Sequence, residues 1–131
     1  MINFLSKYKF IFYFFNLCLI TLYLFPGSIL GFFIYGDLKI QPQITPDFVV
    51  STNHVYAFLL TSLLGVLTFF RTRRLKVLFM YLFFLSIVLE VFHLFIPERS
   101  FQLADLFGNV FGVILVIIIN YCLKKYENYK S

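Results

Sequence analysis

The sequence contains four apolar runs that are long enough, or nearly long enough, to cross a lipid bilayer as helices. A transmembrane helix needs about 20 mostly apolar residues. The four runs cover residues 8–25, 48–70, 75–96 and 103–123. The first ends at Pro26-Gly27, the third at Pro97 and the last at Lys124-Lys125. We therefore predict an all-α polytopic membrane protein, a four-transmembrane-helix bundle that forms a single domain over residues 1–131.

Composition excludes the main soluble alternatives. The chain has only 131 residues, and 61% of them are hydrophobic. A soluble protein of this size has too little interior to bury so much apolar surface. The net charge of +5 does not indicate a nucleic-acid partner, because the basic residues lie at the ends of the apolar runs, as they do in membrane proteins.

Residues 28–35 are apolar but too short to span a bilayer, and Pro26-Gly27 and Gly36-Asp37 flank them. We expect an interfacial or re-entrant turn there, followed by a loop over residues 36–46. The next helix is predicted to begin with Thr45 as its N-cap and Pro46 as its first residue.

The distribution of lysine and arginine predicts the orientation. With four spans, one side receives nine basic residues: Lys7, Lys9, Arg71, Arg73, Arg74, Lys76, Lys124, Lys125 and Lys130. The other side receives only Lys39 and Arg99. Because cytoplasmic loops of membrane proteins carry the excess of positive charge, we expect both termini in the cytoplasm, the N-in/C-in arrangement.

The rare polar residues of the spans fall in the outer half of this predicted bundle. They are His54, Glu90, His93, Asp105 and Asn109, with Arg99 in the outer loop. Glu90 and His93 share a helix face at i, i+3, as do Asp105 and Asn109 at i, i+4. An unpaired carboxylate in lipid is costly, so Glu90 and Asp105 are expected to meet Arg99, His93 or His54. On the fourth helix, Gly108 and Gly112 form a small-xxx-small pattern that permits close helix packing.

Three interpretations of these polar residues stay open. A Glu–Arg–Asp cluster can lock the last two helices together for structure alone. The same residues can form a ligand site, in which the histidines are hydrogen-bond partners of the acids. The least favoured is a metal site, either a metal ion or, lower still, a haem held by paired histidines, since the spacing matches no standard zinc motif and no CxxCH motif occurs. Cys18 and Cys122 form no CxxC pair, and no phosphate-binding glycine motif, metal motif or catalytic nucleophile motif occurs. We therefore predict no cofactor and assign no catalytic residue.

The segment from Glu90 to Gly112, EVFHLFIPERSFQLADLFGNVFG, resembles the signature of the VanZ-like family of bacterial membrane proteins. Family spacing is matched at Glu90, Pro97, Arg99, Asp105, Asn109 and Gly112. Two positions depart from it, because His93 replaces a usual Gln and Glu98 a usual Gly. His54 resembles the histidine of the family's second span, but Val50-Ser51 replaces the Asp-Lys pair before it. The resemblance covers roughly residues 47–116.

The resemblance implies a location in the bacterial inner membrane, because the family consists of bacterial membrane proteins. It also implies a role in the cell envelope, because the family takes its name from a protein associated with low-level teicoplanin resistance. We expect a polar site facing the outer leaflet that binds a lipid headgroup or a glycan-lipid precursor, with Arg99 meeting an anionic group. Its partners would be membrane lipids or another membrane protein, and no nucleic acid. The alternatives are an intramembrane enzyme that uses Glu90 with His93 or His54, and a structural subunit of a larger membrane complex.

Overall fold

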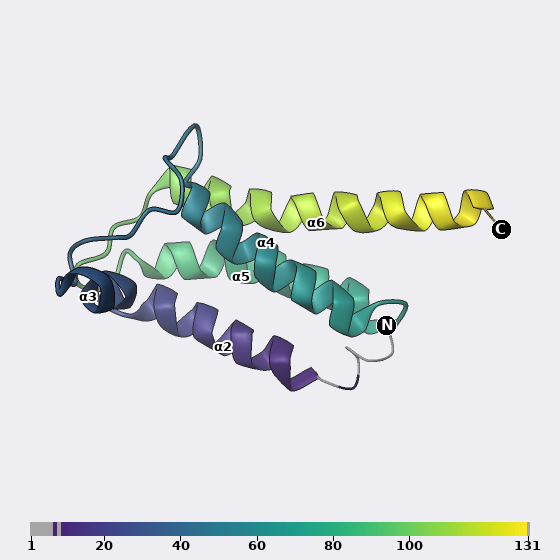
Figure 1. Ribbon diagram of the computed structural model, residues 1–131, viewed down its shortest axis with the longest axis horizontal. Helices are drawn as coiled ribbons and strands as arrows, with labels where there is room; N and C mark the ends of the chain where they lie inside the picture. The colour runs from purple at the N-terminus through teal and green to yellow at the C-terminus, as the bar shows by residue number, and fades with distance from the viewer. Residues whose placement is uncertain (1–6, 8, 131) are drawn as a thin grey trace.

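The computed structural model describes residue 7 and residues 9–130, and every regular element in this part of the chain is helical. The helices are α2 (Lys9–Leu24), α3 (Ile29–Tyr35), α4 (Thr52–Phe69), α5 (Arg74–Phe92) and α6 (Leu103–Lys130). The prediction of an all-α fold is confirmed. Figure 1 shows α2, α4, α5 and α6 running side by side, with the short α3 at one end of the bundle.

Three of these helices, α4, α5 and α6, are long and apolar enough to cross a membrane. The first predicted span differs, because α2 has only 16 residues. It reaches a spanning length only together with α3, from which it is bent by 83°. The described residues therefore provide three candidate spans, or four if the bent pair counts as one span.

The bend between α2 and α3 follows from the local sequence. Pro26 has no amide hydrogen to continue the helix, and Gly27 adopts a left-handed φ of 86°. Ser28 then starts α3 by accepting a hydrogen bond from the amide of Gly31 at 2.9 Å. Gly36, with φ 72°, ends it. The apolar segment 28–35 is thus a short helix lying across the end of the bundle.

The loop and turn segments separate into two ends of the bundle (Figure 1). The loop end consists of α3, residues 36–51 and residues 93–102. The basic end consists of the beginning of α2, residues 70–73 and the C-terminal part of α6. Arg71, Arg73 and Lys124 belong to the basic end, whereas Lys39 and Arg99 belong to the loop end.

Helix α4 begins at Thr52, with Ser51 at the N-cap position, so the predicted start at Thr45-Pro46 is wrong. The reason is that the preceding loop folds back on the helix. Asp47 accepts a hydrogen bond from the amide of Thr52 at 2.9 Å, and Asn53 donates to the carbonyl of Pro42 at 2.6 Å. At the other boundaries, α5 ends at Phe92 rather than near Ile96, and α6 continues as a helix to Lys130.

The apolar core contains buried side chains from α2, α4, α5 and α6, and α4 and α6 approach one another closely at two glycines. A Cβ atom added at Gly108 would lie 2.6 Å from the carbonyl oxygen of Ser51, and one at Gly112 would lie 2.7 Å from that of Val55. The two glycines predicted to permit close packing thus lie against the α4 backbone. Phe58 and Val113 are fully buried beside this contact. Many large apolar side chains point outward, among them Phe14, Phe84 and Phe111, as expected of helices surrounded by lipid.

Candidate functional site

The break at Pro26 leaves backbone carbonyls at the end of α2 without helical donors. The carbonyl of Leu22 would normally accept from residue 26, which is proline. Arg99 fills this place, because its Nη2 donates to Leu22 O at 2.8 Å and its Nε donates to Phe25 O at 3.1 Å. Nε2 of His93 lies 3.0 Å from the carbonyl of Tyr23. The end of α2 is therefore held by side chains that follow α5.

This position of Arg99 corrects one expectation. Within the described residues, Arg99 forms no ion pair with Glu90 or Asp105, so the predicted Glu–Arg–Asp cluster does not form. The guanidinium instead donates to the carbonyls of Leu22, in the last turn of α2, and Phe25, just after the helix, which would otherwise lack donors. Partial burial lowers the pKa of Arg99 from its usual value, but an arginine remains protonated at neutral pH. Its remaining N–H groups are left for other partners.

A buried hydrogen-bond network joins α2, α4, α5 and α6 next to the loop end. Asn109 of α6, which is fully buried, donates through Nδ2 to the carbonyl of Ser86 at 3.1 Å. This leaves its Oδ1 as an acceptor, and the hydroxyl of Tyr23 donates to it at 2.6 Å. Nδ1 of His54 lies 3.0 Å from the same oxygen. Tyr23 also stacks on His93, with 5.8 Å between the ring centroids.

The network assigns the tautomers of both histidines. The Tyr23 hydroxyl lies 3.1 Å from Nδ1 of His54 but gives its single proton to Oδ1 of Asn109, which can only accept. Nδ1 of His54 therefore carries the proton that faces both oxygens. The carbonyl of Tyr23 likewise requires a proton on Nε2 of His93. Each ring then turns its other nitrogen toward a carboxylate. Nε2 of His54 lies 3.6 Å from Oδ2 of Asp105, and Nδ1 of His93 lies 3.2 Å from Oε2 of Glu90.

Glu90 is the most enclosed ionisable group of the site. Its side chain is fully buried, and Oε1 accepts a hydrogen bond from the backbone amide of Gln102 at 3.0 Å. No described group donates a hydrogen bond to Oε2. One ligand atom each from Glu90, His54 and Asp105 lies within 4.8 Å of the other two. Helices α4, α5 and α6 each contribute one member of this His–Glu–Asp cluster.

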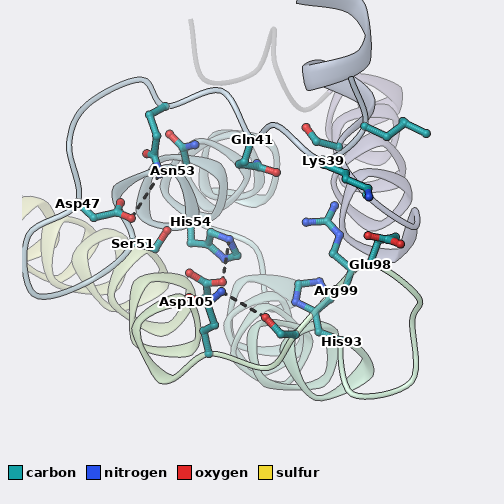
Figure 2. A pocket seen from close by; sticks show the side chains of 16 residues that line it. Lys39, Gln41, Asp47, Ser51, Asn53, His54, His93, Glu98, Arg99 and Asp105 are labelled. Carbon is teal, nitrogen blue, oxygen red and sulfur yellow. Dashed lines mark hydrogen bonds and ion pairs between the residues drawn. The ribbon is translucent and has the colours of Figure 1, made fainter. Parts of the chain in front are cut away.

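A polar pocket of about 360 Å³ opens beside the cluster at the loop end. Charged and polar side chains dominate its wall, including Lys39, Asp47, His54, His93, Arg99 and Asp105. Figure 2 shows His54 and Asp105 facing one another, with Lys39 and Arg99 across the pocket from them. Glu98 lies beside the two cations, so the pocket is lined by two cations and by three carboxylates, those of Asp47, Glu98 and Asp105.

A second pocket, of about 380 Å³, lies next to the first and is mainly apolar. Its wall includes Leu22, Ile29, Leu30, Ile34, Ile44 and Leu60, from α2, α3, the following loop and α4. The two pockets share lining residues, namely Ser28, Gln41, Asn53, His54, His93 and Arg99. Because they share one wall, a single elongated molecule can contact both.

The structure brings all six predicted ligand-binding residues together in or next to the loop end. His54, His93, Arg99 and Asp105 line the polar pocket, whereas Glu90 and Asn109 are buried behind it. Such an arrangement can bind an anion through Arg99 and Lys39, and it can move a proton between a histidine and an acid. The cluster also offers nitrogen and oxygen ligands to a metal ion.

Sequence reasoning missed Tyr23, which contacts both histidines and Asn109. One tyrosine gives little signal in a chain with 9 tyrosines and 20 phenylalanines. Its place one turn before Pro26, in the same half of the bundle as the other polar residues, was the available indication. The hydrogen bond from the backbone amide of Gln102 to Glu90 could not be predicted from the residue type, because almost every residue has such an amide.

The chain was compared with protein-family models, with curated proteins and with solved structures, and none of the three comparisons found a match.

Proposed function

We propose that this chain is a VanZ-like protein of the bacterial cytoplasmic membrane that binds a phosphate-bearing lipid of the cell envelope. The observation that carries the proposal is that the two pockets adjoin. One is polar and has Lys39 and Arg99 on one side, and the other is mainly apolar. An amphipathic molecule needs both surroundings at once. Its headgroup would occupy the polar pocket and the first part of its tail the apolar pocket.

Two cations of the polar pocket can hold an anionic headgroup, beside the carboxylates of Asp47, Glu98 and Asp105. Arg99 uses two of its N–H groups on α2 carbonyls and keeps the others for a ligand. Lys39 lines the same pocket and adds a second cation. Charge-assisted hydrogen bonds from arginine and lysine are the usual means of holding phosphate groups in proteins. Both a phospholipid and a lipid-linked glycan precursor present this chemistry.

The orientation belongs to the same proposal. In it, the loop end faces away from the cytoplasm and both termini lie inside the cell. Its support is the nine-to-two distribution of lysine and arginine between the basic end and the loop end. The family assignment is supported by the residues matched between Glu90 and Gly112. A lipid would then enter the apolar pocket from the outer leaflet.

The proposal is tested by lipids that remain bound after purification in a mild detergent. Leu60 lines the apolar pocket, so Leu60→Trp should fill the space for the tail and lower the bound lipid at least fivefold. Leu67→Trp is the matched control, because Leu67 lies two turns further along the same face of α4, outside both pockets. Mass spectrometry of the extract distinguishes a phospholipid from a lipid-linked glycan. Equal lipid content in the two variants would refute the proposal.

A second candidate is the intramembrane enzyme, which the contact of 3.2 Å between His93 Nδ1 and Glu90 Oε2 favours. Here Glu90 would act as acid or base on a lipid in the polar pocket through His93, which contacts Glu90 and lines the pocket. The same mass spectra test it, since an enzyme would convert added lipid and Glu90→Gln would stop the conversion. Unchanged lipid after prolonged incubation with the wild-type protein would exclude this candidate for the lipid tested.

A further inference from the structure

We infer that His54, Glu90 and Asp105 bind one divalent transition-metal ion beside the polar pocket. One ligand atom from each residue lies within 4.8 Å of the other two. Around an ion such as Zn²⁺, with bonds of about 2.0–2.2 Å, tetrahedral ligand atoms lie roughly 3.3 Å apart. The separation of 3.6 Å between His54 Nε2 and Asp105 Oδ2 already approaches this value. The other pairs of ligand atoms, which lie within 4.8 Å, would have to close by up to about 1.5 Å on binding.

The tautomer of His54 is an independent reason for a cation at this place. Nδ1 carries the proton that is given to Asn109, so in the neutral ring Nε2 presents a lone pair toward Asp105. Two acceptors then face each other, which is unfavourable without a cation between them. A metal-binding histidine ordinarily donates its other N–H to a protein acceptor in this way. Asn109 therefore has the place of a residue that orients a ligand.

Glu90 supplies a second reason. Its side chain is fully buried, yet no described group donates a hydrogen bond to Oε2. Nδ1 of His93 faces it at 3.2 Å, in a ring whose assigned proton is given to the Tyr23 carbonyl. Burying a charged oxygen without a hydrogen bond or a counter-charge is strongly unfavourable. One divalent ion would neutralise Glu90 and Asp105 together.

The competing arrangement has both histidines doubly protonated, giving two separate imidazolium–carboxylate pairs. It fits the geometry less well, because neither contact is a hydrogen bond. The distance from His54 to Asp105 is too long at 3.6 Å, and the shorter contact of His93 leaves Glu90 Oε2 without a donor. A metal ion requires no such hydrogen atoms between ring and acid.

The proposed site would keep one position open to the pocket. His54 and Asp105 line the pocket, whereas Glu90 lies behind its wall. Three protein ligands with an open fourth position are typical of zinc sites that bind a water or a ligand oxygen. A phosphate oxygen is one such ligand. The metal site stands on the cluster alone and does not require that the pocket bind a lipid.

Metal binding to the full-length protein in detergent tests the inference. After removal of metals with a chelator, calorimetry with Zn²⁺ should give about one ion per chain. His54→Gln and Asp105→Asn should each weaken binding at least tenfold. Glu98→Gln is the control, because Glu98 lines the same pocket outside the cluster and should leave binding unchanged. Circular dichroism without metal verifies that each variant is folded.

A measurement on the wild-type protein does not depend on any variant. Co²⁺ bound by nitrogen and oxygen ligands in a four- or five-coordinate site gives visible absorption bands much stronger than those of hydrated Co²⁺. These bands should saturate at one equivalent. No saturable binding of Zn²⁺ or Co²⁺ would overturn the inference in favour of two His–carboxylate pairs. Equal loss of binding in Glu98→Gln and Asp105→Asn would overturn it too. Neither result would bear on the lipid proposal, which is tested separately by the lipid content of Leu60→Trp.

Discussion

Nη2 of Arg99 lies 2.8 Å from the carbonyl oxygen of Leu22, the acceptor that Pro26 leaves without its helical donor. The break that ends α2 and the arginine that follows α5 are thus two parts of one arrangement. Proline creates the bend toward α3, and a side chain 77 residues further along the chain satisfies the freed carbonyl. This contact fixes the end of α2 against the residues that line both pockets.

Removing the Arg99 side chain should destabilise the fold through this carbonyl. Arg99→Ala leaves Leu22 O unsatisfied and should lower the free energy of unfolding by about 1–3 kcal/mol. Thermal unfolding in detergent measures the loss, and Lys39→Ala serves as the control for removal of a pocket cation.

In a Pro26→Ala background, residue 26 regains an amide hydrogen that can reach Leu22 O. Arg99→Ala should then cost at least about 0.5 kcal/mol less, and strict additivity would contradict this explanation.

Loss of the Tyr23 hydroxyl should affect Asn109 and His54 together. Tyr23→Phe removes the donor at 2.6 Å from Asn109 Oδ1 and should lower the free energy of unfolding by about 1 kcal/mol. The loss of unfolding free energy caused by Tyr23→Phe should be smaller in an Asn109→Ala background, because the acceptor of the hydroxyl is then already absent. Tyr121→Phe, at a side chain that is 65% exposed, should have no measurable effect. An unchanged cost of Tyr23→Phe in the Asn109→Ala background would show that the pair is not coupled.

Gly112 and Gly65 should respond differently to alanine. The added Cβ at Gly112 would meet the backbone of Val55 at 2.7 Å, which cannot move without shifting α4. We expect Gly112→Ala to destabilise by about 1–3 kcal/mol. At Gly65 the nearest atom is the end of the Leu78 side chain at 2.8 Å, which can change rotamer. Gly65→Ala should therefore cost clearly less in thermal unfolding, and the reverse order would refute the close contact of α4 and α6.

Accessible cysteines test the proposed orientation in whole bacterial cells. In a background without Cys18 and Cys122, Lys39→Cys and Ser100→Cys at the loop end should react with a membrane-impermeant thiol reagent. Thr72→Cys at the basic end should react only after the membrane is opened. All three positions are exposed, so access to the side chain itself does not limit labelling. Labelling of Thr72→Cys alone in intact cells would reverse the orientation.

The sequence predicted the helical fold and the group of polar residues because both depend on local patterns. Apolar runs near spanning length predict helices, and Pro26-Gly27 predicts the end of the first of them. Spacings of three and four place Glu90 with His93 and Asp105 with Asn109 on single helix faces. These features need no knowledge of which helices are neighbours.

The tertiary structure alone decided which groups meet. Arg99 was expected beside Glu90 and Asp105, but it contacts carbonyls that become free only because α2 ends beside it. Tyr23 joins both histidines because α2 packs on α4 and α5, a fact that no spacing in α2 contains. Hydrogen-bond partners in a membrane bundle come from other helices, and helical periodicity defines a face but not the neighbour of that face. The two adjoining pockets, and the His–Glu–Asp cluster drawn from three helices, follow from this packing.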